Sequence, residues 1–373
     1  MEIGPIRPPS EAHSLLIRVS RNCTWNKCLF CHTYKDQPFS RRSASEVKAD
    51  IRQAKEISEH IKRLSWELGY GGKISGDLVV FAGQRYGPEY QQIALWLYKG
   101  GTSAFLQDAN NLSLPADQLA EIVAFLRETF PSLERVTSYA RSASVAKKSL
   151  AELRELKEAG LTRIHIGLES GYDPLLTYMR KGVTATAHVV AGLAVKEAGM
   201  ELSEYVILGL GGREMSAEHA LATARVLSEI SPHFIRLRTL AINDMMPLAA
   251  KVAAGEFTPL GEDEIVREER LLVENLDCQG SHLMSDHSLN LLMEVNGQLP
   301  EDKGAMLALI DRYLGLPDEE RLIFALGRRT GNYYRLDDMA RDLHREQLEA
   351  MAARLVARGQ VEEALSVMKS RYI

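Results

Sequence analysis

The sequence of 373 residues lacks several features that would assign it to a specialised class of protein. It has only four cysteines, and a chain of this length buries a large core without disulfide staples. No apolar run is long enough to cross a bilayer, and the start lacks a basic stretch followed by an apolar one. A net charge of −5 with interspersed signs gives no overall basic field for nucleic acid. We therefore expect a cytoplasmic globular protein that does not bind membranes and whose partner is a small molecule rather than nucleic acid, while the mixed charges leave room for a local basic patch.

Apolar strands and amphipathic helices alternate along the first two thirds of the chain. The strand-like segments are residues 14–20, 102–109, 134–140, 162–170, 203–212 and 232–240. Two of the helices that follow them begin with capping-box pairs, Ser43 with Glu46 and Ser149 with Glu152. This alternation predicts parallel βαβ units, and therefore an α/β barrel or open barrel. The apolar segment 77–83 is interpreted as a further strand with no assigned place.

Beyond about residue 245 the hydrophobic period becomes that of helices. We therefore predict two domains, a barrel over residues 1–245 and a helical C-terminal region over residues 246–373. The helical region is expected to cover the open face of the barrel as a lid. No Gly/Ser-rich linker marks the boundary between the two.

Three of the four cysteines, Cys23, Cys28 and Cys31, fall within nine positions directly after the first predicted strand. The C-terminal ends of barrel strands are where barrel active sites are built, and clustered thiols in a reducing compartment are typical of metal sites. Three thiolates leave a zinc ion one ligand short, unless His32 or Cys278 completes the site. The same three thiolates leave one iron of a four-iron cluster open to a substrate or cofactor. Otherwise Cys278 is expected to be a buried apolar residue.

The segment "CTWNKCLFC" resembles the cysteine loop of the radical S-adenosylmethionine (SAM) superfamily, in which an aromatic residue precedes the last cysteine. That aromatic residue is Phe30 here. The spacing Cys-x4-Cys-x2-Cys is one residue longer than the usual one of the family. The resemblance implies a partial (β/α)6 TIM-like barrel that holds a [4Fe–4S] cluster on Cys23, Cys28 and Cys31, with SAM as the second cofactor and Phe30 beside it.

Two later segments extend the resemblance, which covers roughly residues 14–245. "IHIGLESGYDPLLTYMRKG" is similar to the fourth-strand segment of the coproporphyrinogen-dehydrogenase and methylthiotransferase-like branch, which implies that Glu169 contacts the SAM ribose. "YVILGLGG" is similar to the fifth-strand segment of that branch, which implies that Gly209 and Gly211 pack against the adenosine. Taken alone, Glu169 is equally explained by a cap or an ion pair, and the glycines by tight packing.

The segment "FLQDANN" stands where much of the superfamily has a Gly-Gly-Glu segment that holds the methionine amino group of SAM. The resemblance therefore makes Asp108 and Asn110 candidates for that role, with "FAGQ" over residues 81–84 as the alternative alignment. Arg141 follows the third predicted strand and is a further candidate for cofactor binding through a carboxylate, against the alternative of a structural ion pair.

Polar residues in the C-terminal region are candidates for contact with a substrate. Asp286, His287 and Asn290 in "SDHSLNLL" have helical spacing before an apolar run, so they are either catalytic or the N-terminal cap of a helix. We predict that Asp286 and His287 point into the active-site cavity. Arg236 and Arg238 are candidates for carboxylate binding, with surface ion pairs as the alternative.

The function that the resemblance implies is reductive cleavage of SAM. An electron from reduced flavodoxin or ferredoxin would yield a 5′-deoxyadenosyl radical that abstracts hydrogen from a small or medium-sized substrate, in an oxygen-sensitive enzyme. One alternative is radical modification of RNA or a peptide, although no basic run or RNA-binding module is visible and one spare cysteine cannot build a second three-cysteine cluster. Another alternative is a zinc-stabilised binding protein without redox chemistry.

Overall fold

The structure, a computed structural model, describes residues 1–341 and 344–370 and contains two compact units. The first unit comprises Met1–Asn26, Thr33–Ile166 and Leu193–Leu202, and the second comprises Lys27–His32, Gly167–Gly192 and the chain from Ser203 onwards. This division passes through strands β6 (Arg163–Glu169) and β7 (Glu201–Leu208). The predicted boundary between residues 245 and 246 stays a prediction.

Parallel strands form the centre of the first unit. They are β1 (Leu15–Arg18), β4 (Ser103–Gln107), β5 (Arg135–Ala140) and the start of β6. The helices and 3-10 turns of this unit are η1 (Pro9–Glu11), α1 (Ala44–Glu67), α2 (Gly76–Tyr86), α3 (Pro88–Tyr98), η2 (Asn111–Ser113), α4 (Ala116–Thr129), α5 (Ser142–Val145) and α6 (Leu150–Glu158). A short antiparallel pair, β2 (Ser20–Arg21) and β3 (Ser40–Arg41), flanks the segment that carries the cysteines.

Local sequence signals account for the helix starts of this unit. Both predicted capping boxes are present, at the starts of α1 and α6. The predicted strand over residues 77–83 is wrong, because this segment lies within helix α2. The Ser75 hydroxyl accepts the Leu78 N–H and caps that helix, which buries Leu78, Val79 and Ala82 on one side. A short apolar run is not long enough for its hydrophobic period to distinguish a strand from a helix. The N-terminal cap at Ser75 favours the helix.

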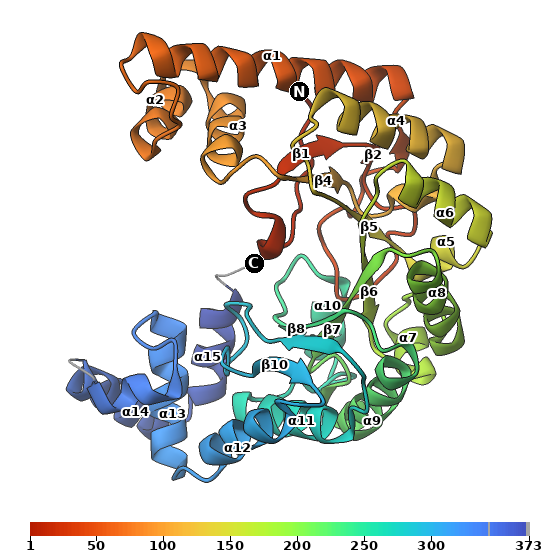
Figure 1. Cartoon of the computed structure of the whole chain (residues 1–373). Helices are drawn as coiled ribbons and strands as arrows, with labels where there is room; N and C mark the ends of the chain where they lie inside the picture. Colours follow the sequence, from red (N-terminus) through yellow and green to blue (C-terminus); the bar gives the residue numbers. More distant parts are fainter. Residues whose placement is uncertain (342–343, 371–373) are drawn as a thin grey trace. The chain divides into compact units, whose positions relative to one another are not determined.

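The second unit contains the later strands and most of the C-terminal helices. Strand β7 pairs in parallel with β8 (Phe234–Thr239), β8 pairs in parallel with β9 (Ser281–Met284), and β9 pairs antiparallel with β10 (Asn296–Leu299). Helix α11 packs against both α9 and α12 (Figure 1). The helices and turn of this unit are α7 (Asp173–Tyr178), α9 (Gly212–Ile230), α10 (Pro247–Ala253), α11 (Glu262–Asn275), α12 (Lys303–Leu314), α13 (Asp318–Thr330), η3 (Leu336–Arg341), α14 (Arg345–Arg358) and α15 (Val361–Ser370). Helix α8 (Ala185–Glu197) contributes residues to both units.

The predicted fold class, an α/β partial barrel followed by a helical region, is confirmed. All six predicted strands are present as β1, β4, β5, β6, β7 and β8, and the eight-stranded sheet has the order β1-β4-β5-β6-β7-β8-β9-β10. The C-terminal region is not wholly helical, since it also contributes β9 and β10. The segment "SDHSLNLL" is a loop between these two strands, so the helix expected there is wrong. Strands β9 and β10 are short and partly polar, so their apolar residues do not alternate over enough positions to predict a strand.

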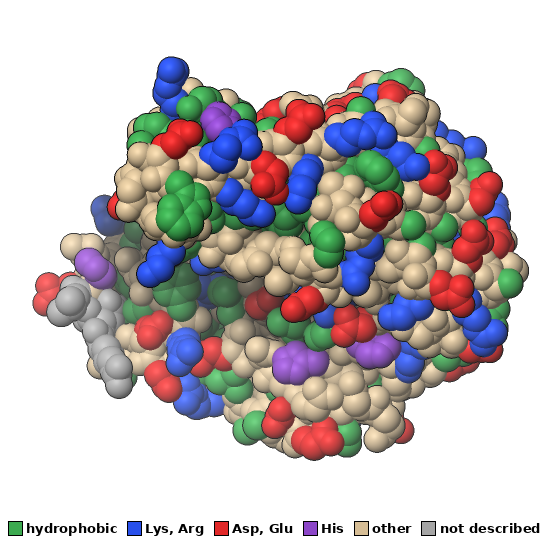
Figure 2. Space-filling view, turned by 45° about the horizontal axis from the view of Figure 1, so that its top comes forward, with side chains coloured by type: hydrophobic (Ala, Val, Ile, Leu, Met, Phe, Trp, Pro, Cys, Tyr) green, Lys and Arg blue, Asp and Glu red, His purple; other side chains and the backbone are tan. Residues whose placement is uncertain are grey.

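The charge pattern of the surface and the apolarity of the helices can be compared with the sequence. Lys and Arg side chains are interspersed with Asp and Glu on the face that Figure 2 shows, in agreement with the mixed charge pattern of the sequence. Across residues 1–341 and 344–370, no helix is both long enough and apolar enough to span a membrane.

Candidate active site

The cysteine segment begins directly after β2, and both of its halves are held by hydrogen bonds. In the first unit, the Asn22 amide N–H donates to Asp108 Oδ2 at 3.1 Å, and the Asn22 side chain donates to the Pro38 carbonyl at 2.7 Å. In the second unit, the Leu29 N–H donates to the Met179 carbonyl at 3.0 Å. The side chain of Leu29, between Cys28 and Cys31 in the sequence, lies in a buried cluster with Leu175, Met179, Leu210, Met246, Leu248 and Phe257. The segment is therefore fixed on both sides of its cysteines.

Asn110 and Arg141 contact the residues that follow Cys23. The buried Asn110 amide donates to the hydroxyls of Thr24 and Ser144, each at 2.8 Å, and its carbonyl oxygen accepts the Arg141 N–H at 3.0 Å. The Arg141 guanidinium lies 5.0 Å from the centre of the Trp25 ring. The structure thus brings two predicted cofactor residues to the cysteine segment, where Asn110 has a clear structural task.

Asp108 is fully buried and is held by an arginine. Its Oδ2 accepts Nε and Nη2 of Arg18 at 2.8 and 2.6 Å. Burial, followed by the negative charge of Asp108, raises the pKa of the Tyr34 hydroxyl far above its usual range. Asp108 is therefore a buried carboxylate that Arg18 pairs with and that accepts the Asn22 N–H at the start of the cysteine segment.

Phe30 and Glu169 come together through a residue that sequence reasoning missed. The Lys181 ammonium donates to Glu169 Oε1 at 2.9 Å and lies 5.7 Å from the centre of the Phe30 ring. Glu169 ends strand β6 with a φ of 63°, a left-handed conformation that is unfavourable for a residue with a side chain. Lys181 lies in no recognisable strand or loop motif. Its position twelve residues after Glu169 was the one signal in the sequence for a contact between the two.

A second acidic side chain, Glu204 on β7, is also absent from the sequence predictions. It is fully buried, and neither of its carboxylate oxygens has a hydrogen-bond partner among the described residues. Burial, and then the nearby charge of Glu169, raise its pKa well above the usual value, while Lys181 opposes them. Its surroundings therefore favour the protonated form of Glu204. A glutamate directly before the apolar run "YVIL" of its strand was the available signal.

The two predicted glycines lie where β7 leads into α9, and each has a backbone reason to be glycine. Gly209 has a φ of 80°, and its N–H donates to Glu268 Oε1 at 2.6 Å. The other oxygen of that carboxylate accepts the Ser216 hydroxyl. A Cβ on Gly211 would lie 2.8 Å from the Met215 carbonyl oxygen, closer than real Cβ atoms come. These glycines let the backbone turn tightly at the end of β7.

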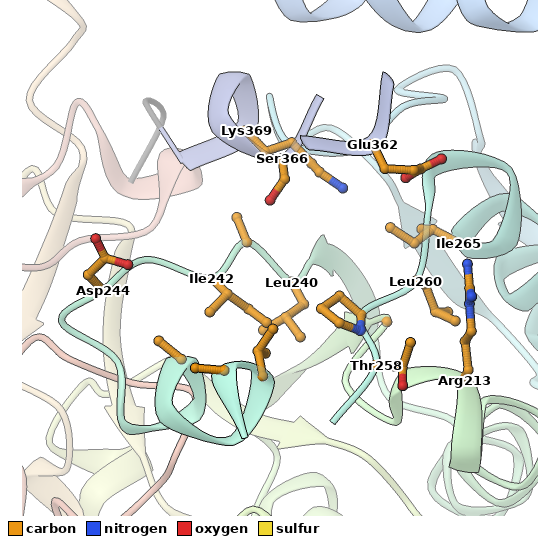
Figure 3. Close-up of a pocket in the computed structure, with 16 residues that line it drawn as sticks. Arg213, Leu240, Ile242, Asp244, Thr258, Leu260, Ile265, Glu362, Ser366 and Lys369 are labelled. Carbon is orange, nitrogen blue, oxygen red and sulfur yellow. The ribbon is translucent and has the colours of Figure 1, made fainter. Parts of the chain in front are cut away.

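A cavity of about 470 Å³ in the second unit borders Gly209. Its wall is partly apolar and partly polar, and Arg213, Glu362 and Lys369 supply charged groups (Figure 3). Helix α15 contributes Glu362, Ser366 and Lys369 to one side of it. The other residues that line it are Leu240, Ala241, Ile242, Asp244, Ala249, Val252, Ala253, Thr258, Pro259, Leu260 and Ile265. The size and lining are those of a small-molecule site.

Buried ion pairs hold the helices around this cavity together. Glu262 at the start of α11 accepts Nε and Nη2 of Arg329 at 2.9 and 2.8 Å, and Lys369 lies 3.4 Å from it. Burial would raise the pKa of Glu262, but Arg329 and Lys369 outweigh it and lower that pKa to about 2. Helix α15 is thereby connected to α11 and α13.

Asp286 and His287 lie in the loop after β9, beside two arginines of β8. The Asp286 carboxylate oxygens are 3.7 Å from Arg236 Nη1 and 3.6 Å from Arg238 Nη1. Burial, and then Arg238, lower the pKa of His287 to about 4, so its ring is neutral at pH 7. His287 Nδ1 accepts the Leu289 N–H at 3.2 Å, which places the ring proton on Nε2. Asn290 is a structural residue here, because its amide donates to the Leu237 carbonyl and to Ser285.

A comparison of the sequence with models of known protein families identifies the family of this chain. The sequence model described as the radical SAM superfamily matches residues 17–226, more than half of the 373 residues. The chain belongs to the radical SAM superfamily. Membership makes it an enzyme and implies reductive cleavage of SAM with an iron–sulfur cluster and an electron donor. The match includes the cysteine segment and strands β4 to β7.

This radical SAM chain also resembles individual proteins over limited lengths. A 116-residue stretch is 20% identical to the tRNA uridine(34) acetyltransferase of Methanocaldococcus jannaschii, covering 31% of this chain and 21% of that enzyme. The structure of coproporphyrinogen III oxidase (HemN) from Escherichia coli matches with a TM-score of 0.44 and 13% identity, over 70% of this chain and 52% of that one. The methyltransferase TsrM from Kitasatospora setae matches with a TM-score of 0.46 and 14% identity, over 95% and 64%. This chain thus spans about a fifth of the acetyltransferase and less than two thirds of either solved chain.

The cysteines of this radical SAM enzyme have the donor chemistry that a [4Fe–4S] cluster requires. Cys23, Cys28 and Cys31 are partly exposed, and Cys278 is buried as predicted. Three thiolates leave one iron of such a cluster open. Within the described ranges 1–341 and 344–370, no three His, Cys, Asp or Glu side chains are arranged to hold a metal ion. The ligand assignment therefore rests on the thiol chemistry and on the family, and it stays a prediction.

Proposed function

We propose that this radical SAM enzyme holds a [4Fe–4S] cluster on Cys23, Cys28 and Cys31 and abstracts hydrogen from a small or medium-sized molecule. The observation that carries the proposal is the family match over residues 17–226, which includes all three clustered cysteines. Reduced by flavodoxin or ferredoxin, the bound cluster would supply the electron that cleaves SAM to methionine and a 5′-deoxyadenosyl radical. The protein side chains bind, orient and shield the reacting groups.

The cavity at Gly209 is the proposed place for the adenosine of SAM. Leu240, Ile242 and Ile265 line it with apolar side chains that suit a base, and the Gly209 backbone approaches from the end of β7. About 470 Å³ lies within the usual range of small-ligand sites. Because helix α15 lines the same cavity, this geometry supports the expectation that the C-terminal region acts as a lid.

The family resemblance assigns the polar ends of SAM to four side chains. Glu169 is the proposed partner of the ribose hydroxyls, and its carboxylate is held ready by Lys181 beside Phe30. Asp108 and Asn110 are proposed for the methionine amino group, where Asp108 would use Oδ1, since Oδ2 pairs with Arg18. Arg141, above the Trp25 ring, is proposed for the carboxylate.

Asp286 and His287 are proposed to orient the substrate. The neutral His287 ring offers its Nε2–H as a donor, and the half-buried Asp286 carboxylate lies next to it in the same loop. Such groups would fix the carbon that loses hydrogen, and a misplacement of about 1 Å costs on the order of 100-fold in rate. Their proposed role is positioning and does not include proton transfer.

RNA modification is the second candidate function. It is favoured by the 20% identity to an enzyme named for its action on tRNA, over 116 residues. The mixed charge pattern of this chain offers no general attraction to a polyanion, so a small molecule remains the first proposal. Binding to tRNA at about 150 mM salt, compared with polyanionic heparin, separates the two.

Metal analysis tests the proposal. Protein purified without oxygen is expected to be brown and to contain about four iron and four sulfide per chain. Replacing Cys23, Cys28 or Cys31 by Ala removes the iron, and the matched control Cys278→Ala retains it. A colourless protein with one zinc per chain would contradict the proposal and favour the zinc-stabilised alternative.

A further inference from the structure

Strand β8 presents two arginines at alternate positions, Arg236 and Arg238, next to strand β7. Tyr205 and Ile207 are their register partners on β7. Residues two apart on a strand point to the same side of the sheet, so the two guanidinium groups share one side. Their positive charges repel each other unless something negative lies between them.

Both guanidinium groups are fixed in place by neighbouring groups. Arg236 Nε donates to the Ser203 hydroxyl at 3.2 Å, and its guanidinium lies 5.5 Å from the centre of the Phe234 ring. Arg238 Nη1 donates to the Leu237 carbonyl at 2.7 Å, and its guanidinium lies 5.0 Å from the centre of the Tyr205 ring. This orientation is preorganised, so a ligand would not have to order these long side chains.

The negative charge next to Arg236 and Arg238 does not neutralise both guanidinium groups. Asp286 is the one carboxylate paired with these two guanidinium groups among the described residues, and its distances of 3.7 and 3.6 Å exceed those of charge-assisted hydrogen bonds. Arg236 Nη1, Arg238 Nη2 and Asp286 Oδ1 are buried and have no hydrogen-bond partner in the described chain. Two positive charges against one negative charge leave a local excess of one positive charge.

Buried donors without hydrogen-bond partners are unfavourable, so a cluster that keeps them is suited to a ligand that completes it. Arg236 is only 3% exposed, which makes its unpartnered Nη1 a well-shielded donor. The side chain of Asp286 is 35% exposed, so the cluster is open to solvent on that side. His287 adds a third donor, Nε2–H, next to the carboxylate.

We propose that Arg236 and Arg238 bind a carboxylate group of the substrate, with Asp286 limiting the site to a single negative charge. This inference rests on the proposed function, since it assigns the bound molecule as the substrate. A planar carboxylate accepts two parallel N–H bonds from a guanidinium fork, which a halide cannot do. A phosphate dianion would bring a second charge against Asp286, so the site discriminates by repulsion as well as by attraction.

Carboxylate binding is measured by isothermal titration of the anaerobically purified full chain with acetate and butyrate, at ionic strength held constant with chloride. Saturable binding is expected for both acids, and at least tenfold weaker binding of inorganic phosphate. Arg236→Gln and Arg238→Gln are each expected to weaken butyrate binding at least tenfold. The matched control is Arg270→Gln, which removes the same charge from an exposed ion pair on α11 and is expected to leave binding unchanged.

The counter-ion role has its own test. Asp286→Asn removes the repulsion and is expected to tighten phosphate binding at least tenfold while butyrate still binds. Absence of saturable carboxylate binding by the wild-type chain, or equal losses in Arg238→Gln and Arg270→Gln, would overturn the inference. If Arg236→Gln does not fold, as judged by its thermal unfolding, Arg238→Gln carries the test because its side chain is more exposed.

Release of 5′-deoxyadenosine from SAM without substrate is measured on the same preparations. Intact release without carboxylate binding refutes the carboxylate site and leaves the proposed function standing. Carboxylate binding without any such release refutes the proposed function and leaves the anion site as a binding site.

Discussion

Removing the Glu169 carboxylate tests whether this residue contacts SAM or only holds Lys181. Glu169 and Lys181 lie 2.9 Å apart with side chains 14% and 10% exposed, so the pair is largely shielded from water. If the carboxylate accepts a ribose hydroxyl, Glu169→Ala removes a shielded hydrogen bond and weakens SAM binding by about 1–3 kcal/mol. That is a rise in the dissociation constant of roughly 5- to 150-fold.

A double-mutant cycle separates the two roles. In a Lys181→Met background, the effect of Glu169→Ala on SAM binding persists if the carboxylate contacts SAM, and disappears if its task is to position Lys181. The assay is equilibrium dialysis of labelled SAM against cluster-loaded protein without oxygen, with iron content measured alongside. Glu256→Ala is the matched control, because it removes the carboxylate of an exposed Lys251 pair in the same unit. An unchanged dissociation constant in Glu169→Ala would remove this residue from the SAM site.

Two further predictions concern the surroundings of the site. The ion pairs lower the pKa of Glu262 from its ordinary value of 4.5 to about 2 in the folded chain. These pairs therefore stabilise the fold above pH 4.5, and this stabilisation is lost as the pH falls through 2. Denaturant unfolding should show a steeper loss of stability between pH 5 and 2 in the wild type than in Glu262→Gln, and equal slopes would contradict the assignment. Asn110→Ala removes the hydrogen bonds to Thr24, Ser144 and Arg141 and is expected to cost about 1–3 kcal/mol of stability and to speed iron loss to a chelator. Unchanged iron release would show that Asn110 does not support the cysteine segment.

The strands and helices of the first two thirds could be predicted from the sequence because their local signals agree with one another. Strand β1 begins with a buried apolar run, Leu15–Ile17, and capping boxes mark the starts of α1 and α6. The errors lie where those signals are weak. Helix α2 is a short apolar run, and β9 and β10 are four-residue strands with polar side chains.

The candidate site could be predicted only where a residue has a motif around it. The cysteines and Glu169 lie in recognisable segments, whereas Lys181 and Glu204 act through contacts that the fold creates. The contacts of the loop after β9 could not be predicted from the sequence either. Its polar residues have helical spacing, yet Asn290 bonds to the backbone of β8, and Asp286 lies beside the two arginines of that strand.

We propose that this chain cleaves SAM reductively on a cluster held by its three clustered cysteines. The most direct measurement is the release of 5′-deoxyadenosine from SAM after reduction with dithionite, without oxygen and without substrate, followed by mass spectrometry. We expect slow release by the wild type and by Cys278→Ala, and none by Cys28→Ala. Wild-type protein that contains its iron yet releases no 5′-deoxyadenosine, or equal release by Cys28→Ala, would contradict it.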